Sequence, residues 1–189
     1  MRTLVTNCGE IAHLSTGDDE FPLSGHHLLD RERLVHPPGM SILINENKVE
    51  KVAPTQDLIS EFAPWYPGNS EYGGTRVIDV NGMSVVPGFV DCHTHLVWSG
   101  DRANELAMRV SGKSYKDIAA SGGGIMKTVL ETRSAPADSL VGSGIRRVNS
   151  ALLNGTTSIE AKSGYGLDLD SEVKILEAIS VIDRSTPCN

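Results

Sequence analysis

The sequence predicts an α/β protein in which a small β-rich module, residues 1–83, precedes the first part of a (β/α)8 TIM-type barrel, residues 84–189. An apolar, β-rich run at 85–90 leads into His93-Thr94-His95, and helix and strand signals alternate after it, as in parallel βαβ units. Roughly 105 residues follow from Val85, enough for about three strand–helix units of a barrel that takes about 250 residues. We therefore expect an incomplete, truncated barrel, the front part of a larger enzyme.

Residues 1–83 carry the signals of short strands joined by turns. The expected order is a strand within 2–14, an irregular polar loop at 15–39, a β-hairpin at 40–52, a short helix at 56–62 and a loop at 63–74. Asn81-Gly82 is a strong hairpin turn, so residues 76–80 and 83–90 are expected to pair as neighbouring strands. The expected role of this module is to support the barrel.

Beyond His95 the signals become helical. The expected order is short helices near 105–110 and 114–118, a long helix at 134–154, a strand at 156–161 and a final amphipathic helix after Asp170. Gly155 is the expected stop of the long helix, because glycine readily adopts the left-handed backbone found there. The run Gly122-Gly123-Gly124 has two interpretations, a turn or a place where the backbone approaches a ligand closely.

Composition limits the function classes. A net charge of -7 and a pI near 5.3 provide no basic surface for nucleic acid or anionic lipid. No stretch approaches the ~20 apolar residues of a membrane span, so we expect a soluble, cytoplasmic protein. The three cysteines, Cys8, Cys92 and Cys188, are odd in number and far apart, which does not suggest a disulfide framework. Cys92 is expected to be a small buried thiol, because strand alternation turns it away from His93 and His95.

His93 and His95 are the candidate metal ligands. Side chains two residues apart on a strand point the same way, and the carboxyl end of a barrel strand opens onto the face that carries the chemistry. Neutral imidazole is a good ligand for zinc or iron, but a catalytic site needs at least three protein ligands and an open position. The pair His26-His27 lies in the polar loop without a suitably spaced partner and is interpreted as solvated.

Three further side chains lie where a substrate could reach them. Arg102 could bind a substrate carboxylate through paired hydrogen bonds, or it could be a surface residue paired with Asp101. Tyr165, between two glycines after the strand at 156–161, could offer its hydroxyl to a substrate, or it could pack over the barrel rim. Lys162 could be a carbamylated metal bridge, although a salt bridge to Glu160 or Asp168 is the preferred interpretation.

These residues lie in strings that resemble a known family. PGFVDCHTHLVWSGDR, SGGGIMKTV and GTTSIEAKSGYGLDLDSEVKIL are similar to the imidazolonepropionases, metal-dependent hydrolases of the amidohydrolase superfamily that act in histidine degradation. The likeness runs from about residue 42 to residue 182. The resemblance implies that His93 and His95 bind one divalent metal, zinc or iron, and that Arg102 and Tyr165 contact 4-imidazolone-5-propanoate. The family's other metal ligands and its acid–base residues would then fall beyond Asn189.

The resemblance implies hydrolysis of a cyclic amide, with N-formimidoyl-L-glutamate as the product. One alternative is another amidohydrolase, such as a heterocyclic-base deaminase, which would share the histidine pair but would not need Arg102 for a propionate. A second is a catalytically inactive fragment or isoform that acts through association with another chain. The expected partner is a small-molecule substrate, a homo-oligomer of the full-length enzyme stays open, and the 189-residue chain alone is expected to be inactive.

Overall fold

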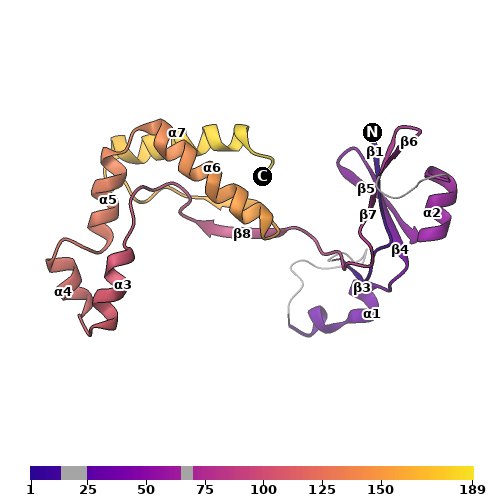
Figure 1. The fold of residues 1–189 in the computed structure, drawn as a ribbon, viewed down its shortest axis with the longest axis horizontal. Helices are drawn as coiled ribbons and strands as arrows, with labels where there is room; N and C mark the ends of the chain where they lie inside the picture. Colours follow the sequence, from indigo (N-terminus) through magenta and orange to yellow (C-terminus); the bar gives the residue numbers. More distant parts are fainter. Residues whose placement is uncertain (14–24, 65–69) are drawn as a thin grey trace. The chain divides into compact units, whose positions relative to one another are not determined.

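The structure is a computed structural model that describes residues 1–13, 25–64 and 70–189. The chain divides into two compact units, Met1–Pro87 and Gly88–Asn189, which we describe separately (Figure 1). The first unit thus ends at Pro87, whereas the sequence analysis placed the boundary after residue 83.

The first unit is built on a five-stranded sheet with the strand order β5-β4-β1-β7-β6. Its strands are β1 (Arg2–Thr6), β4 (Met40–Asn45), β5 (Lys48–Pro54), β6 (Ser70–Tyr72) and β7 (Thr75–Asp79). β1 runs parallel to β7 and antiparallel to β4, and Leu4, Leu43 and Val77 from these three strands form the centre of the core. The helix α2 (Thr55–Phe62) inserts Leu58 into the same core and covers one side of the sheet.

The remaining elements of this unit are short. They are β2 (Ile11–Ala12), a 3-10 helix (Gly25–Leu29), α1 (Arg31–Leu34) and β3 (Val35–His36). β2 and β3 pair with each other in antiparallel register. The predicted loop at 15–39 lies partly outside the described residues, as do the side chains of His26 and His27, whose interpretation as solvated stays a prediction.

One predicted hairpin is present and the other is wrong. β4 and β5 form the hairpin expected at 40–52, joined at Glu46 and Asn47. Asn81 and Gly82 do make a turn with positive φ, but the chain after them does not pair with β7. Instead Met83 and Val85 bond to the backbone that follows β1, through Gly9 N–H and Ala12 N–H. The place beside β7 is already taken by β1 and β6, so a hairpin there would have no free edge.

The second unit contains two parallel strands, β8 (Phe89–Thr94) and β9 (Thr156–Ala161), which pair with each other. The last residue extends this sheet, because Asn189 N–H donates to Thr157 O at 3.0 Å and Asn189 O accepts Ile159 N–H at 2.7 Å. This is the hydrogen-bond pattern of a parallel neighbour on the far side of β9. The sheet therefore has parallel β/α connectivity, whereas closure into a barrel stays a prediction.

Five helices complete the unit: α3 (Ala103–Val110), α4 (Tyr115–Ala120), α5 (Ile125–Ser134), α6 (Ala137–Leu153) and α7 (Leu169–Ser185). The sequence analysis missed α5 and started the long helix at Ser134. The helix breaks there because Pro136 disfavours a helical backbone at Ala135, which is extended. Gly155, with φ of 90°, follows the end of α6 as expected.

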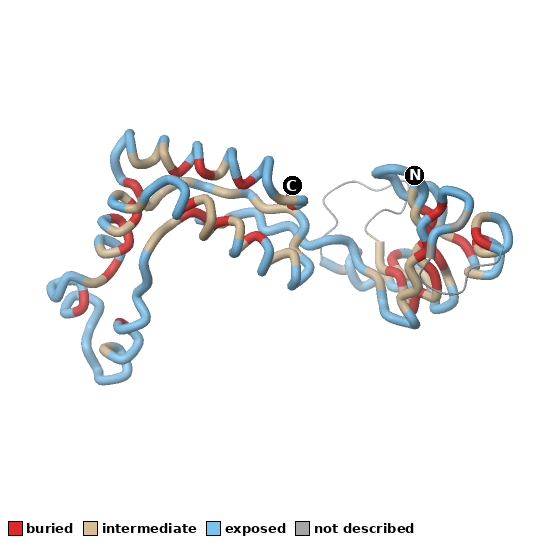
Figure 2. The backbone as a smooth tube through the Cα atoms, turned by 45° about the horizontal axis from the view of Figure 1, so that its top comes forward, coloured by how far each residue is buried: buried red, intermediate tan, exposed pale blue. Residues whose placement is uncertain are grey.

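The core of the second unit lies on one side of β9. α6 and α7 contribute buried residues along the faces they turn toward each other and toward the sheet, including Leu140, Val148, Ile175 and Ile182 (Figure 2). No residue of β8 belongs to this core, and its Phe89 and Val90 are 57% and 68% exposed. Cys92 is exposed for the same reason, so its prediction as a buried thiol is wrong. The described fold is thus mixed α/β, with a strand that carries predicted site residues but is little covered by helices.

Candidate functional site

His93 and His95 lie at the carboxyl end of β8. Their ring centroids are 5.6 Å apart, with the rings nearly perpendicular. Gly164, in the loop after β9, packs directly on His95, and a Cβ added at Gly164 would lie 2.7 Å from the imidazole Cε1. Gly164 also has a φ of 146°, which side chains disfavour. Both the backbone conformation and the lack of space for a Cβ beside His95 therefore require glycine here.

Tyr165 is brought to the histidines by the parallel pairing of β8 and β9. Because both strands end at the same edge, the loop after β9 lies beside the residues that follow Thr94, and Lys162 N–H donates to Thr94 O at 2.8 Å. The Tyr165 and His95 rings lie in a T-shaped arrangement with centroids 5.5 Å apart. The structure therefore places His93, His95 and Tyr165 in one row of rings.

A cleft of about 90 Å³ opens beside this row. It is lined by Trp98, Asp101, Arg102, Thr128 and Tyr165. Arg102 and Tyr165, which are far apart in sequence, thus share one cleft, while the two histidines are not among the residues that line it. Asp101 does not pair with Arg102: its carboxylate accepts Ala103 N–H at 2.9 Å, and Arg102 forms no ion pair within the described part of the chain.

The loop between β8 and α3 is held from behind by Arg147 of α6. Its guanidinium donates to Leu96 O at 2.9 Å and to Trp98 O at 3.1 Å, and it stacks over the Trp98 ring at 3.7 Å. Burial lowers the pKa of Arg147, with a smaller contribution from neighbouring Arg146. Arg147 thereby fixes one wall of the cleft, because Trp98 has one ring face covered by the cation.

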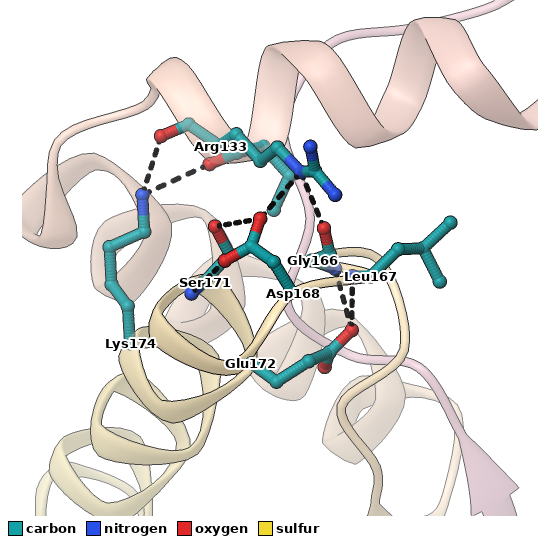
Figure 3. Close-up of polar contacts among 8 residues, drawn as sticks. Arg133, Gly166, Leu167, Asp168, Ser171, Glu172 and Lys174 are labelled. Carbon is teal, nitrogen blue, oxygen red and sulfur yellow. Dashed lines mark hydrogen bonds and ion pairs between the residues drawn. The ribbon is translucent and has the colours of Figure 1, made fainter.

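The loop that carries Tyr165 is held by a second polar network (Figure 3). The Glu172 carboxylate accepts Gly166 N–H at 2.8 Å and Leu167 N–H at 2.7 Å. Arg133 Nε lies 2.6 Å from Gly166 O and 2.8 Å from an oxygen of Asp168, the N-cap of α7. Together these contacts tie the loop to α5 on one side and α7 on the other.

The charge of Glu172 suits this arrangement. Burial raises the pKa of its carboxyl, but donors from Leu167, the Ser163 hydroxyl, Gly166 and Gly164 outweigh burial and lower the pKa overall. Its second oxygen is buried and accepts no hydrogen bond of standard geometry from a described residue. Sequence reasoning missed Glu172, Arg133 and Arg147, whose pattern in the sequence is that of ordinary surface residues of amphipathic helices.

Two predicted alternatives can be compared with the structure. Lys162 Nζ forms an ion pair with Glu160 at 2.8 Å, which lowers the pKa of the Glu160 carboxyl. This is the salt bridge that the sequence analysis preferred over a carbamylated bridge. The glycines at 122–124 turn around Glu105, whose carboxylate accepts Gly124 N–H at 2.7 Å. Backbone therefore approaches a buried carboxylate of the protein at this point.

The histidine pair fits a metal site in kind and in spacing. Two imidazoles that share a tetrahedral zinc, each with a Zn–N distance of about 2 Å, have centroids about 5 Å apart, close to the observed 5.6 Å. Within residues 1–13, 25–64 and 70–189, no three histidine, cysteine or acidic side chains are grouped as a metal would require. The role of His93 and His95 as metal ligands therefore stays a prediction.

The fold matches that of known hydrolases. The structure of E. coli guanine deaminase superposes with a TM-score of 0.56 at 18% identity, covering 97% of this chain and 34% of that one. A triazine hydrolase variant superposes with a TM-score of 0.52 at 17% identity, covering 95% of this chain and 33% of the other. The described residues thus share the fold of about a third of each of these two proteins. None of the described helices is long and apolar enough to cross a membrane.

Sequence comparison identifies the family to which the chain belongs. The chain is 40% identical over 186 residues to the imidazolonepropionase of Symbiobacterium thermophilum, which covers 97% of this chain and 40% of that protein. It is 44% identical over 149 residues to the imidazolonepropionase of Idiomarina loihiensis, a match that covers 79% of this chain and 34% of that protein. It is 51% identical over 112 residues to the imidazolonepropionase of Pseudomonas fluorescens, a match that covers 59% of this chain and 28% of that protein. No family model matches. The chain is a homologue of the imidazolonepropionases and spans two-fifths or less of the length of these relatives.

Proposed function

We propose that this chain provides part of the active site of a cytoplasmic, metal-dependent hydrolase that converts 4-imidazolone-5-propanoate to N-formimidoyl-L-glutamate. The observation that carries the proposal is the cleft shared by Tyr165 and Arg102, whose guanidinium forms no ion pair with a described residue, next to His95. A guanidinium without a counter-ion among the described residues suits a substrate carboxylate, and the neighbouring rings suit a planar heterocycle. The relatives' name agrees with a substrate that has both groups.

Each residue has a distinct role in this proposal. His93 and His95 would be two ligands of one divalent metal, zinc or iron, for which the described residues offer no third ligand grouped with them. When bound, such a metal provides hydroxide near neutral pH and polarises the ring carbonyl. Arg102 binds the propionate and thereby orients the ring toward the histidines. Tyr165, which contacts His95 and lines the cleft, donates its hydroxyl to the substrate and to the product.

The alternative is a heterocyclic-base deaminase. The observation that favours it is the fold likeness to guanine deaminase. Arg102, which has no ion-pair partner among the described residues, argues against it, because an uncharged base offers no carboxylate to balance a guanidinium in the cleft.

A chimera tests the two activities directly. We would replace the matched segment of the S. thermophilum imidazolonepropionase with this chain and assay the purified, metal-loaded protein on 4-imidazolone-5-propanoate and on guanine. We expect ring opening of the first and no deamination of the second. The unmodified relative and the chimera with His93→Ala serve as positive and negative controls. A folded, metal-loaded chimera without hydrolysis would favour the inactive-fragment alternative, and guanine turnover would favour the deaminase.

A further inference from the structure

Two buried threonines of α5, Thr128 and Thr132, differ in the hydrogen bonding of their hydroxyls. Thr128 and Thr132 are 6% and 0% exposed and lie one helical turn apart on the same face. The Thr132 hydroxyl accepts Ser99 N–H at 3.0 Å, which secures the loop between β8 and α3. The Thr128 hydroxyl makes no hydrogen bond to any residue that the structure describes. Thr128 instead lines the cleft, together with Arg102 and Tyr165.

The Thr128 hydroxyl faces the cleft and not the packed interior of the unit. The described residue with a fully buried side-chain oxygen that lacks a partner is Glu172, not Thr128, so the Thr128 hydroxyl is reached by solvent from the cleft. Threonine in a helix often bonds to the carbonyl one turn earlier, here Gly124, but Thr128 makes no such bond. The hydroxyl is therefore available for a group that enters the cleft.

We infer that Thr128 is a specificity-determining residue whose hydroxyl donates a hydrogen bond to the carboxylate that Arg102 binds. A planar guanidinium occupies part of a carboxylate's acceptor sites, and a neutral donor can satisfy another without adding charge. Trp98, braced by Arg147, closes the cleft on another side and limits where the carboxylate can lie. The identity of the ligand rests on the proposed function, whereas the unpartnered hydroxyl does not.

The matched variants Thr128→Val and Thr132→Val separate binding from stability. Denaturant unfolding of each variant is measured beside wild type, in the 189-residue chain and in the chimera. We expect Thr132→Val to increase the unfolding equilibrium constant about fivefold, because Ser99 N–H loses its acceptor. Thr128→Val is expected to leave that constant unchanged or to lower it, since no protein hydrogen bond is lost.

Kinetics of the chimera then test recognition. The propionate does not change during the reaction, so losing its hydrogen bond should raise KM about tenfold for Thr128→Val, with the effect on KM rather than on kcat. Thr128→Ser, which keeps the hydroxyl, should recover most of the affinity. Thr128→Val that unfolds as readily as Thr132→Val, or that binds substrate as well as wild type, would overturn the inference.

The inference and the proposed function can fail separately. If the chimera does not hydrolyse 4-imidazolone-5-propanoate, the proposed function fails, and calorimetric titration of the chimera with imidazole-4-propionate decides the role of Thr128. Binding that weakens about tenfold in Thr128→Val supports the contact with a carboxylate. Equal binding by wild type and variant, or no binding by wild type, contradicts it.

Discussion

The two units use their strands differently. In the first, β1 lies in the middle of a five-stranded sheet, and its Leu4 is fully buried between neighbouring strands and α2. In the second, β8 has only β9 as a described neighbour, and its apolar Phe89 and Val90 are exposed. β1 stabilises the first unit, whereas β8 presents His93 and His95 at a sheet edge that the described residues of the second unit do not enclose. The comparison shows that β1 contributes to the core of its unit, whereas β8, which carries the candidate site residues, contributes none of its residues to the core of the second unit.

The largest expected effect concerns the histidines of β8. In the chimera, His93→Ala or His95→Ala should leave a folded protein that has lost its metal and nearly all turnover, because each removes a ligand. Metal analysis of the purified protein and far-ultraviolet circular dichroism measure the two properties. The 189-residue chain alone should show no turnover, because its described residues offer too few ligands. Full metal content in both alanine variants would contradict the assignment.

Packing provides the next largest effect and tests the comparison itself. Leu4→Ala should lower the free energy of unfolding by about 2–5 kcal/mol, as large-to-small changes in a well-packed core do. Val90→Ala should change it by less than about 0.5 kcal/mol, because an exposed side chain has little packing to lose. Chemical denaturation of both variants measures the difference. Equal losses would mean that β8 is covered in the protein as it exists in solution.

A smaller effect is expected at Arg102. Removing a charge-assisted pair costs about 1.5–3 kcal/mol, so Arg102→Ala should lower kcat/KM of the chimera at least about tenfold. Arg102→Lys should recover only part of the loss, because lysine lacks the planar, bidentate guanidinium. Stability should be unchanged in both variants, since Arg102 forms no ion pair with a described residue. Wild-type kinetics in both would show that Arg102 is a surface residue.

The smallest effect is the pH dependence that comes from Glu172. Its pKa is lowered in the folded chain, so its ionised form stabilises the fold. That contribution is fully present above the unfolded pKa of about 4.3 and is lost as the pH falls through the lower, folded value. Glu172→Gln should therefore flatten the acid side of the stability profile measured by thermal unfolding. An unchanged acid limb would show that the carboxylate does not hold the Tyr165 loop through its charge.

Much of the local architecture could be predicted from the sequence. The β4–β5 hairpin follows from alternating apolar residues and a polar turn, and the end of α6 at Gly155 follows from glycine's tolerance of positive φ. The positions of His93 and His95 on one side of a strand end follow from the two-residue period of β structure. These features depend on residues that are close in sequence, where geometry leaves few choices.

Long-range contacts decided the rest. Whether Asn81-Gly82 joins two paired strands depended on β1 and β6 occupying the edges of β7, and the exposure of Cys92 depended on which side of the sheet the helices cover. Likewise, no sequence pattern shows that the Thr132 hydroxyl meets Ser99 while the Thr128 hydroxyl meets no described residue. By itself the sequence determined which residues could carry chemistry. Only the tertiary structure decided which of them share a cleft and which hydrogen bonds are already made, because packing brings together side chains that are distant in the chain.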